Sequence, residues 1–218
     1  HLSVVNRTCL SAIEFHDNIG DAIAIRGPRY GRAVSLAELP PHVVNAFIAV
    51  EDKRFLAHDG VDYSAIVRAT LENLRAGRTV QGGSTITQQL VKNLVLTSDQ
   101  TLRRKAQEAR LAITLEERLT KDEILELYLN TTYFGGGAYG IDAAAETFFN
   151  TPAQNLTIAQ SAYLASLPKA PSRYANAEAA AALKGRQLYV LDQMVEAGFI
   201  NTSQADDAAS QTLTFAQP

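Results

Sequence analysis

Several kinds of residue are scarce in this sequence, and each scarcity excludes a class of protein or site. Cys9 is the only cysteine, which excludes an internal disulfide and a cysteine-based metal site. The histidines His1, His16, His42 and His58 are scattered, without the close spacing of zinc ligands. Tryptophan is absent. No apolar run approaches the roughly 20 residues that span a bilayer.

Charge of one sign is also lacking, because 20 Lys and Arg face 23 Asp and Glu and leave a net charge of −3. We therefore expect no nucleic-acid partner. The hydrophobic content of 46% over 218 residues is enough for one sizeable core. Because the first residue is His rather than Met, we expect a fragment of a longer protein, from which any signal peptide or membrane anchor would be missing.

The periodicity of the sequence predicts a mainly α protein. Clear strand signals are confined to the beginning, where SAIEFH and DAIAIRG flank the turn-like DNIG. We expect residues 1–34 to form a β ribbon or linker and residues 35–218 a helical domain. SLAE and TKDE have the pattern of capping boxes. Helices are expected over 41–55, 62–77, 101–119, 121–130, 157–167 and 185–198, with another beginning in GGSTITQQLVKN, 82–93.

Two motif matches are rejected on their context. GGGAYG, 135–140, fits the dinucleotide-binding pattern G-x-G-x-x-G, but it follows a helical segment and belongs to no βαβ unit. SLPK, 166–169, fits S-x-x-K, but Pro168 lies inside it and predicts the end of a helix.

The segment GGSTITQQLVKN has two interpretations. A helix N-terminus attracts anions, and glycines allow the backbone to approach a ligand closely. Thr85 followed by Gln88 also fits a capping box, which is an ordinary helix start. The segment alone favours an ordinary helix start, and residues elsewhere in the sequence must decide between this and an anion site.

Two further segments contain candidate catalytic groups. Glu51 and Asp52 lie on the third turn of a predicted apolar helix, where a partly desolvated carboxylate makes a better base, although adjacent acids are more often simply solvated. In RRKAQE, 103–108, Arg104 and Glu108 are four residues apart, a spacing that also fits an ordinary surface ion pair. Together with Lys92, these cations suit phosphate oxygens. The combination suggests transfer of a group away from a phosphate or diphosphate.

Five segments then occur in order: EDKRFLAHDG, GGSTITQQLVKN, RRKAQE, KDEILELYLN and YFGGGAYGIDAAAETFF. Together they resemble the motifs of glycosyltransferase family 51, the peptidoglycan glycosyltransferases, as found in class A penicillin-binding proteins. The resemblance covers roughly residues 35–175. It implies a lysozyme-like helical domain with a small membrane-proximal lobe. It also implies lipid II and the growing glycan chain as substrates.

The resemblance assigns roles to residues. Glu51 would be the general base, and Glu108, the second family glutamate, would organise the cations or the acceptor. Lys92 and Arg104, supported by Lys105, would stabilise the leaving diphosphate. The remaining assignments are Ser84, Thr85, Gln88, Gln89 and Asn93 in the donor pocket, with Asp52 and His58 supporting the first motif.

The resemblance further implies the outer face of the bacterial cytoplasmic membrane as the location, a membrane surface as partner, and inhibition by phosphoglycolipids such as moenomycin. No cofactor is expected to be required, and a divalent cation, Mg²⁺ or Mn²⁺, is left open. Two alternatives remain. A lytic transglycosylase or muramidase would use Glu51 as a general acid, but it has no need for the cations. A non-catalytic cell-wall binding domain would need no intact glutamates.

Overall fold

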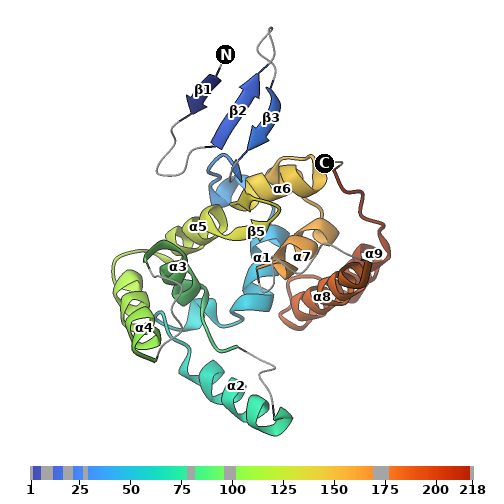
Figure 1. Ribbon diagram of the computed structural model, residues 1–218. Helices are drawn as coiled ribbons and strands as arrows, with labels where there is room; N and C mark the ends of the chain where they lie inside the picture. The colour runs from blue at the N-terminus through green and yellow to red at the C-terminus, as the bar shows by residue number, and fades with distance from the viewer. Residues whose placement is uncertain are drawn as a thin grey trace.

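The structure, a computed structural model, describes residues 2–5, 12–16, 22–26, 29–77, 82–95, 102–168 and 177–216. Helices dominate it and surround an apolar core (Figure 1). The prediction of a mainly α protein is therefore confirmed. The helices within the described residues are α1 (Pro41–Glu51), α2 (Tyr63–Ala76), α3 (Ile86–Val95), α4 (Leu102–Glu116), α5 (Lys121–Thr131), α6 (Ile141–Phe149), α7 (Ile158–Ser166), α8 (Ala177–Glu196) and α9 (Thr202–Ser210).

Two small sheets accompany the helices. The first contains the predicted ribbon, whose two strands pair antiparallel, and an additional strand that the sequence did not predict; the turn DNIG lies outside the described residues. Its strands are β1 (Leu2–Val5), β2 (Ala12–His16) and β3 (Ala22–Arg26). The second sheet has the order β4-β6-β5, with β4 (Arg29–Tyr30) parallel to β6 (Ala138–Tyr139), and with β5 (Tyr133–Gly135) antiparallel to β6. Strands of two or three residues are too short to show an alternating pattern.

α1 lies at the centre of the core because nearly all of its side chains are apolar. Val43, Ala46 and Phe47 are completely buried. The Phe47 ring meets Tyr128 and Phe134 edge-on, with ring centroids 6.2 and 5.8 Å apart. Helices α7 and α8 pack against α1 as well. Because several elements hold α1, its C-terminal residue has a well-defined position.

Capping signals correctly predicted several helix ends. Asp62 caps α2 by accepting a hydrogen bond from the Ala65 amide, and Gly77 ends the helix in a left-handed conformation. The TKDE box forms at the start of α5. The SLAE box opens only a short 3-10 helix, Leu36–Glu38. Helices α6 and α9 and the first turns of α8 were not predicted, because their alanine-rich segments have few large apolar side chains to reveal a period.

The end of α1 corrects the sequence prediction. The helix stops at Glu51 instead of continuing to Phe55. Asp52 leaves the helix with a φ of −158°, and its carboxylate contacts the His58 ring. A short 3-10 helix, Phe55–Ala57, follows, and the side chain of Phe55 is buried.

The segment GGGAYG forms the turn of the β5–β6 hairpin. Strand β5 separates it from α5, so the expectation that it directly follows a helix was wrong, while its lack of a βαβ unit holds. Gly136 and Gly137 have the positive φ angles of a tight turn. A Cβ atom at Gly140 would lie 2.7 Å from the carbonyl oxygen of Asn130. SLPK is the end of a helix, as predicted, because α7 stops at Ser166.

The segment after α9 and helix α2 differ in how they are attached to the rest of the protein. After α9 the chain returns to α6, where the Ala216 amide donates to the Phe148 carbonyl over 2.8 Å. The Phe215 ring lies 5.1 Å from that of Tyr163. At the opposite side of the body, α2 projects outward (Figure 1) and buries only Ala69. Within the described residues, no helix has the length and apolar character needed to cross a membrane.

Candidate active site

A cleft of about 610 Å³ lies at the C-terminal end of α1. Four parts of the chain form its walls: the turn after α1, one face of α2, the segment from Gly82 into α3, and one face of α8. Charged side chains contribute much of the lining: Glu51, Arg54, Arg68, Glu72, Lys92 and Arg186. The cleft therefore suits a polar, charged ligand.

Glu51 is the last residue of α1 and lines the cleft, one turn after the buried Phe47. The side-chain amide of Gln89 donates to its Oε2 over 3.0 Å. The Tyr128 hydroxyl donates in turn to Oε1 of Gln89 over 3.3 Å. Burial, followed by the negative charges of Glu51 and Asp52, raises the pKa of Tyr128 well above its ordinary value. The hydroxyl therefore stays protonated and keeps the amide group of Gln89 directed at Glu51.

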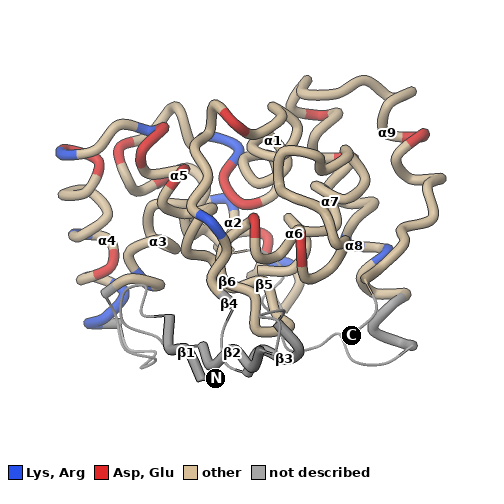
Figure 2. Tube along the Cα trace, turned by 90° about the horizontal axis from the view of Figure 1, so that it is seen from above, with Lys and Arg blue, Asp and Glu red and all other residues tan. Residues whose placement is uncertain are grey.

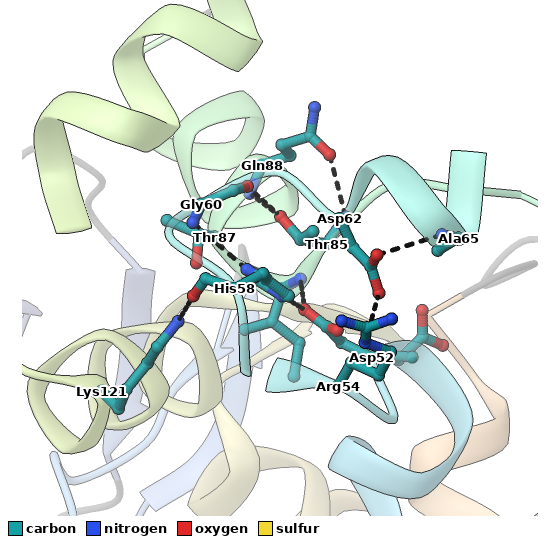
Figure 3. A network of polar contacts seen from close by, with 12 residues as sticks. Asp52, Arg54, His58, Gly60, Asp62, Ala65, Thr85, Thr87, Gln88 and Lys121 are labelled. Carbon is teal, nitrogen blue, oxygen red and sulfur yellow. Dashed lines mark hydrogen bonds and ion pairs between the residues drawn. The ribbon is translucent and has the colours of Figure 1, made fainter. Parts of the chain in front are cut away.

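Asp52 and His58 form a buried pair directly after Glu51 (Figure 3). His58 Nε2 lies 2.8 Å from Asp52 Oδ2. Because the Gly60 amide donates a hydrogen bond to Nδ1 of the same ring, Nε2 carries the ring proton. Nε2 therefore donates a hydrogen bond to the carboxylate. The same Asp52 oxygen accepts the Ile86 amide of α3 over 3.0 Å. The pair thus ties the turn after α1 to the start of α3.

A second set of polar contacts lies next to this pair (Figure 3). Lys121 donates to the His58 carbonyl over 2.6 Å and pairs with Glu116 over 2.7 Å. Its ammonium group lies 4.5 Å from the centre of the Phe55 ring. Thr87 donates to the same glutamate over 2.6 Å. Three helices and the turn after α1 therefore meet at one ion pair, which no sequence motif indicated.

The segment GGSTITQQLVKN begins α3 with a formed capping box. The Thr85 amide donates to Gln88 Oε1, and the Gln88 amide donates to Thr85 Oγ1. Both residues are only 2% exposed, and Gln88 does not line the cleft. A Cβ atom at Gly83 would lie 3.0 Å from the Ile66 Cα, so this glycine permits the close approach of α2. The start of α3 is therefore an ordinary capping box, and the same segment also lines the cleft through Gly82, Gly83, Ser84, Thr85, Gln89 and Lys92.

Basic residues occur at the beginning of α4, a helix that packs against α3 (Figure 2). Lys105 donates to Ser84 Oγ over 2.8 Å, and it also forms a short contact with Glu108 Oε1. Glu108 is buried and Arg104 is half-buried. Ser84 lines the cleft, whereas Asn93 is exposed and does not. The RRKAQE segment therefore reaches the cleft edge through Lys105 and Ser84.

Three cleft cations are not neutralised by a carboxylate within the described part of the chain. Lys92 and Arg68 have neither a hydrogen bond nor an ion pair there. Arg186 donates from Nε to the Ser166 carbonyl over 3.1 Å, but its Nη2 is buried without a hydrogen-bond partner. A buried N–H group without an acceptor is costly, and a ligand oxygen would remove that cost. These side chains are therefore candidates for binding an anion.

No group of three or more His, Cys, Asp and Glu side chains in the described residues is arranged to hold a metal ion. Whether a divalent cation is required stays a prediction from the sequence.

Comparison with known proteins decides the family. A family model described as transglycosylase matches residues 20–195, which is most of the chain. This chain belongs to the transglycosylase family.

Members of the transglycosylase family from distant bacteria are close in sequence. Penicillin-binding protein 1A of Aquifex aeolicus is 46% identical over 93% of this chain and 28% of its own length. Penicillin-binding protein 1F of Bacillus subtilis is 45% identical over 90% of this chain and 28% of its own length. Penicillin-binding protein 1A of Escherichia coli is 44% identical over 89% of this chain and 23% of its own length. The chain thus spans roughly a quarter of the length of these relatives.

A solved structure has a similar fold. The crystal structure of penicillin-binding protein 1A from Haemophilus influenzae matches 99% of this chain and 22% of its own chain, with a TM-score of 0.59 and 22% identity.

Several residues of the transglycosylase cleft were not singled out from the sequence. Arg68 lies on α2, outside every motif quoted from the sequence. Arg186, Tyr189 and Gln193 line the cleft from one face of α8, at the helical spacing i, i+3 and i+7. That spacing is visible in the sequence, but nothing in it indicates that α8 faces Glu51.

Proposed function

We propose that this transglycosylase domain is a peptidoglycan glycosyltransferase that polymerises lipid II into β-1,4 glycan strands. Lipid II is a disaccharide-pentapeptide attached to undecaprenyl diphosphate. The observation that carries the proposal is the carboxylate of Glu51 at the end of a buried helix, in a cleft whose cations Lys92 and Arg68 have no partner in the described residues. The names of the relatives agree with a role in cell-wall synthesis.

The proposed reaction needs one base and a site for a diphosphate. Glu51 accepts the proton of the acceptor sugar's 4-hydroxyl, and that oxygen attacks the anomeric carbon of the donor. The bond from this carbon to the diphosphate oxygen breaks, and the electron pair leaves with undecaprenyl diphosphate. The configuration inverts from α to β. Because a neutralised diphosphate is a good leaving group, no general acid is needed.

The cations on different walls suit a reaction in which both substrates carry a diphosphate. Lys92 of α3, together with Arg104 and Lys105 at the start of α4, would hold the leaving diphosphate of the growing chain. Arg68 of α2 and Arg186 of α8 line the same cleft and would hold the diphosphate of the acceptor. A glycan hydrolase would gain little from these charges, since its leaving group is a sugar hydroxyl.

Polymerisation of labelled lipid II tests the proposal. We expect glycan strands from lipid II and no soluble fragments from purified sacculi. Fragments from sacculi, with no polymer from lipid II, would favour a lytic transglycosylase or muramidase. Binding without either product would indicate a non-catalytic cell-wall domain. A parallel reaction with a chelator, followed by addition of Mg²⁺ or Mn²⁺, tests the metal requirement.

The substrate's lipid tail suggests that the domain works against the outer face of the bacterial cytoplasmic membrane. Exposed apolar side chains on α2 support this: Val67 is 59%, Leu71 49% and Leu74 78% exposed. We expect the domain to float with liposomes at low salt. Leu71→Glu with Leu74→Glu should abolish flotation, while the exposed Leu188→Ala on α8 serves as control. Equal flotation of both variants would contradict membrane contact through α2.

A further inference from the structure

Tyr189 of α8 is the only aromatic side chain among the residues that line the described cleft. It is 45% exposed and has no ring contact with any described residue. Other tyrosines of similar exposure are different: Tyr30 and Tyr133 both lie against the ring of Tyr139. A face of the Tyr189 ring is therefore open, and it is open inside a concave site.

The position of Tyr189 follows from the way α8 crosses the cleft. Lys53, two residues after Glu51, pairs with Glu196 at the end of α8 over 2.7 Å. Tyr189 lies two turns earlier, about 10 Å along the helix axis. Arg186, with its buried Nη2, lies almost one turn further. The cleft face of α8 therefore leads from the region of Glu51 past an open aromatic ring to a guanidinium group.

We propose that Tyr189 is a specificity-determining residue that stacks against a pyranose ring of the substrate. The inference rests on the proposed function, which makes the ligand a sugar diphosphate. The C–H groups on one face of a pyranose are apolar and suit an aromatic ring, while Arg186 takes an anionic oxygen on the same side. One tyrosine meets this need in a chain without tryptophan, because the cations supply the rest of the binding.

Titration of a soluble short-tailed lipid II analogue tests the role of the ring. All variants are made in a Glu51→Gln background, so that no turnover occurs, and thermal melts check the fold. We expect Tyr189→Phe to bind within twofold of the parent, because the ring remains. Tyr189→Leu should weaken binding about 3- to 10-fold, because apolar volume is kept and the aromatic face is lost. Leu188→Ala, exposed on the adjacent position outside the cleft, should bind like the parent.

Steady-state polymerisation by the variants with Glu51 intact separates the two proposals. Tyr189→Leu should raise the KM for lipid II and leave kcat nearly unchanged. If the parent makes no polymer while the analogue still binds through Tyr189, the glycosyltransferase assignment fails and the sugar contact stands. If the parent polymerises lipid II but Tyr189→Leu binds the analogue as the parent does, the sugar contact is overturned. An analogue that does not bind the parent overturns both.

Discussion

The buried polar residues around Asp52 and the cations on the cleft walls differ in hydrogen bonding, although Asp52 and Lys92 both come from the quoted motifs. Asp52, a buried residue of the cleft lining, accepts from both His58 and the Ile86 amide. On the walls, Lys92 and Arg68 have no partner among the described residues. Membership of a motif therefore does not separate residues that hold the site together from residues that meet a ligand. The hydrogen-bond partners of each residue make that separation.

The sharpest test of this comparison is Glu51→Gln. Glutamine keeps the shape of the side chain but cannot accept the proton, so we expect polymerisation to fall about 10²- to 10⁴-fold. The melting temperature should stay close to that of the parent, because glutamine has the same shape and its amide oxygen can still accept the hydrogen bond from Gln89. Polymerisation assays and thermal melts on one preparation measure both. Turnover within a few fold of the parent would exclude Glu51 as the base.

Lys92→Ala tests the open walls. We expect weaker binding of a phosphoglycolipid inhibitor such as moenomycin, by about 1.5–3 kcal/mol, because a charge-assisted contact is lost. Stability should not change, since Lys92 is exposed and has no partner within the described residues. Arg110→Ala, on an exposed position of α4 outside the cleft, is the control. Equal affinity of both variants would remove Lys92 from the anion site.

His58→Ala tests the buried layer. Loss of the imidazole leaves a buried oxygen of Asp52 with one hydrogen-bond donor fewer. The free energy of unfolding should therefore fall by about 1–3 kcal/mol. Activity should fall along with stability, whereas Lys92→Ala should weaken binding and leave stability unchanged. Urea unfolding followed by tyrosine fluorescence measures the change. A fully active variant of unchanged stability would show that the layer does not position Glu51.

Asp62→Asn should have the smallest effect. Burial pushes the pKa of Asp62 up, but hydrogen bonds from Ser64 and the Ala65 amide, with the charge of Arg54, bring it below its ordinary value of 3.8. A lowered pKa means that the ionised form stabilises the fold above that value and that this gain is lost as the pH falls through the folded value. Asparagine can still cap α2.

Stability curves at neutral and acidic pH check this expectation. Asp62→Asn should lose a few tenths of a kcal/mol at pH 7, and the difference from the parent should vanish at the acidic end. A constant difference at every pH would assign the effect to geometry and not to charge.

Local signals made part of the fold predictable. The caps of α2 and α5 depend on residues within one turn, so the sequence states them directly. The pairing of β4 with β6 depends on residues 29–30 meeting 138–139, and neither stretch is long enough to show a period. The early end of α1 places Asp52 against the His58 ring, six residues later, and this contact exists only after the turn has closed.

The site was predictable to the extent that ordered motifs supplied it. Glu51, Gln89 and Lys92 all line the cleft, and all were singled out from motifs. Arg68 and Arg186 were not, because packing brings α2 and α8 to the cleft. Thr85 and Gln88 show the opposite limit: both form the helix cap, but only Thr85 also lines the cleft, and the sequence does not distinguish the two.

The return of the chain from α9 to α6 has a mechanical consequence. The contacts of Ala216 with Phe148 and of Phe215 with Phe149 attach the end of the α7–α8–α9 series to the body, and α8 itself packs against α1 and α7. Within the described residues, α2 has no comparable attachment at its C-terminal end and buries only Ala69. The wall of the cleft on α8 is therefore held more firmly than the wall on α2. Ligands of different thickness should be accommodated by displacement of α2, while the face that carries Tyr189 and Arg186 keeps its place.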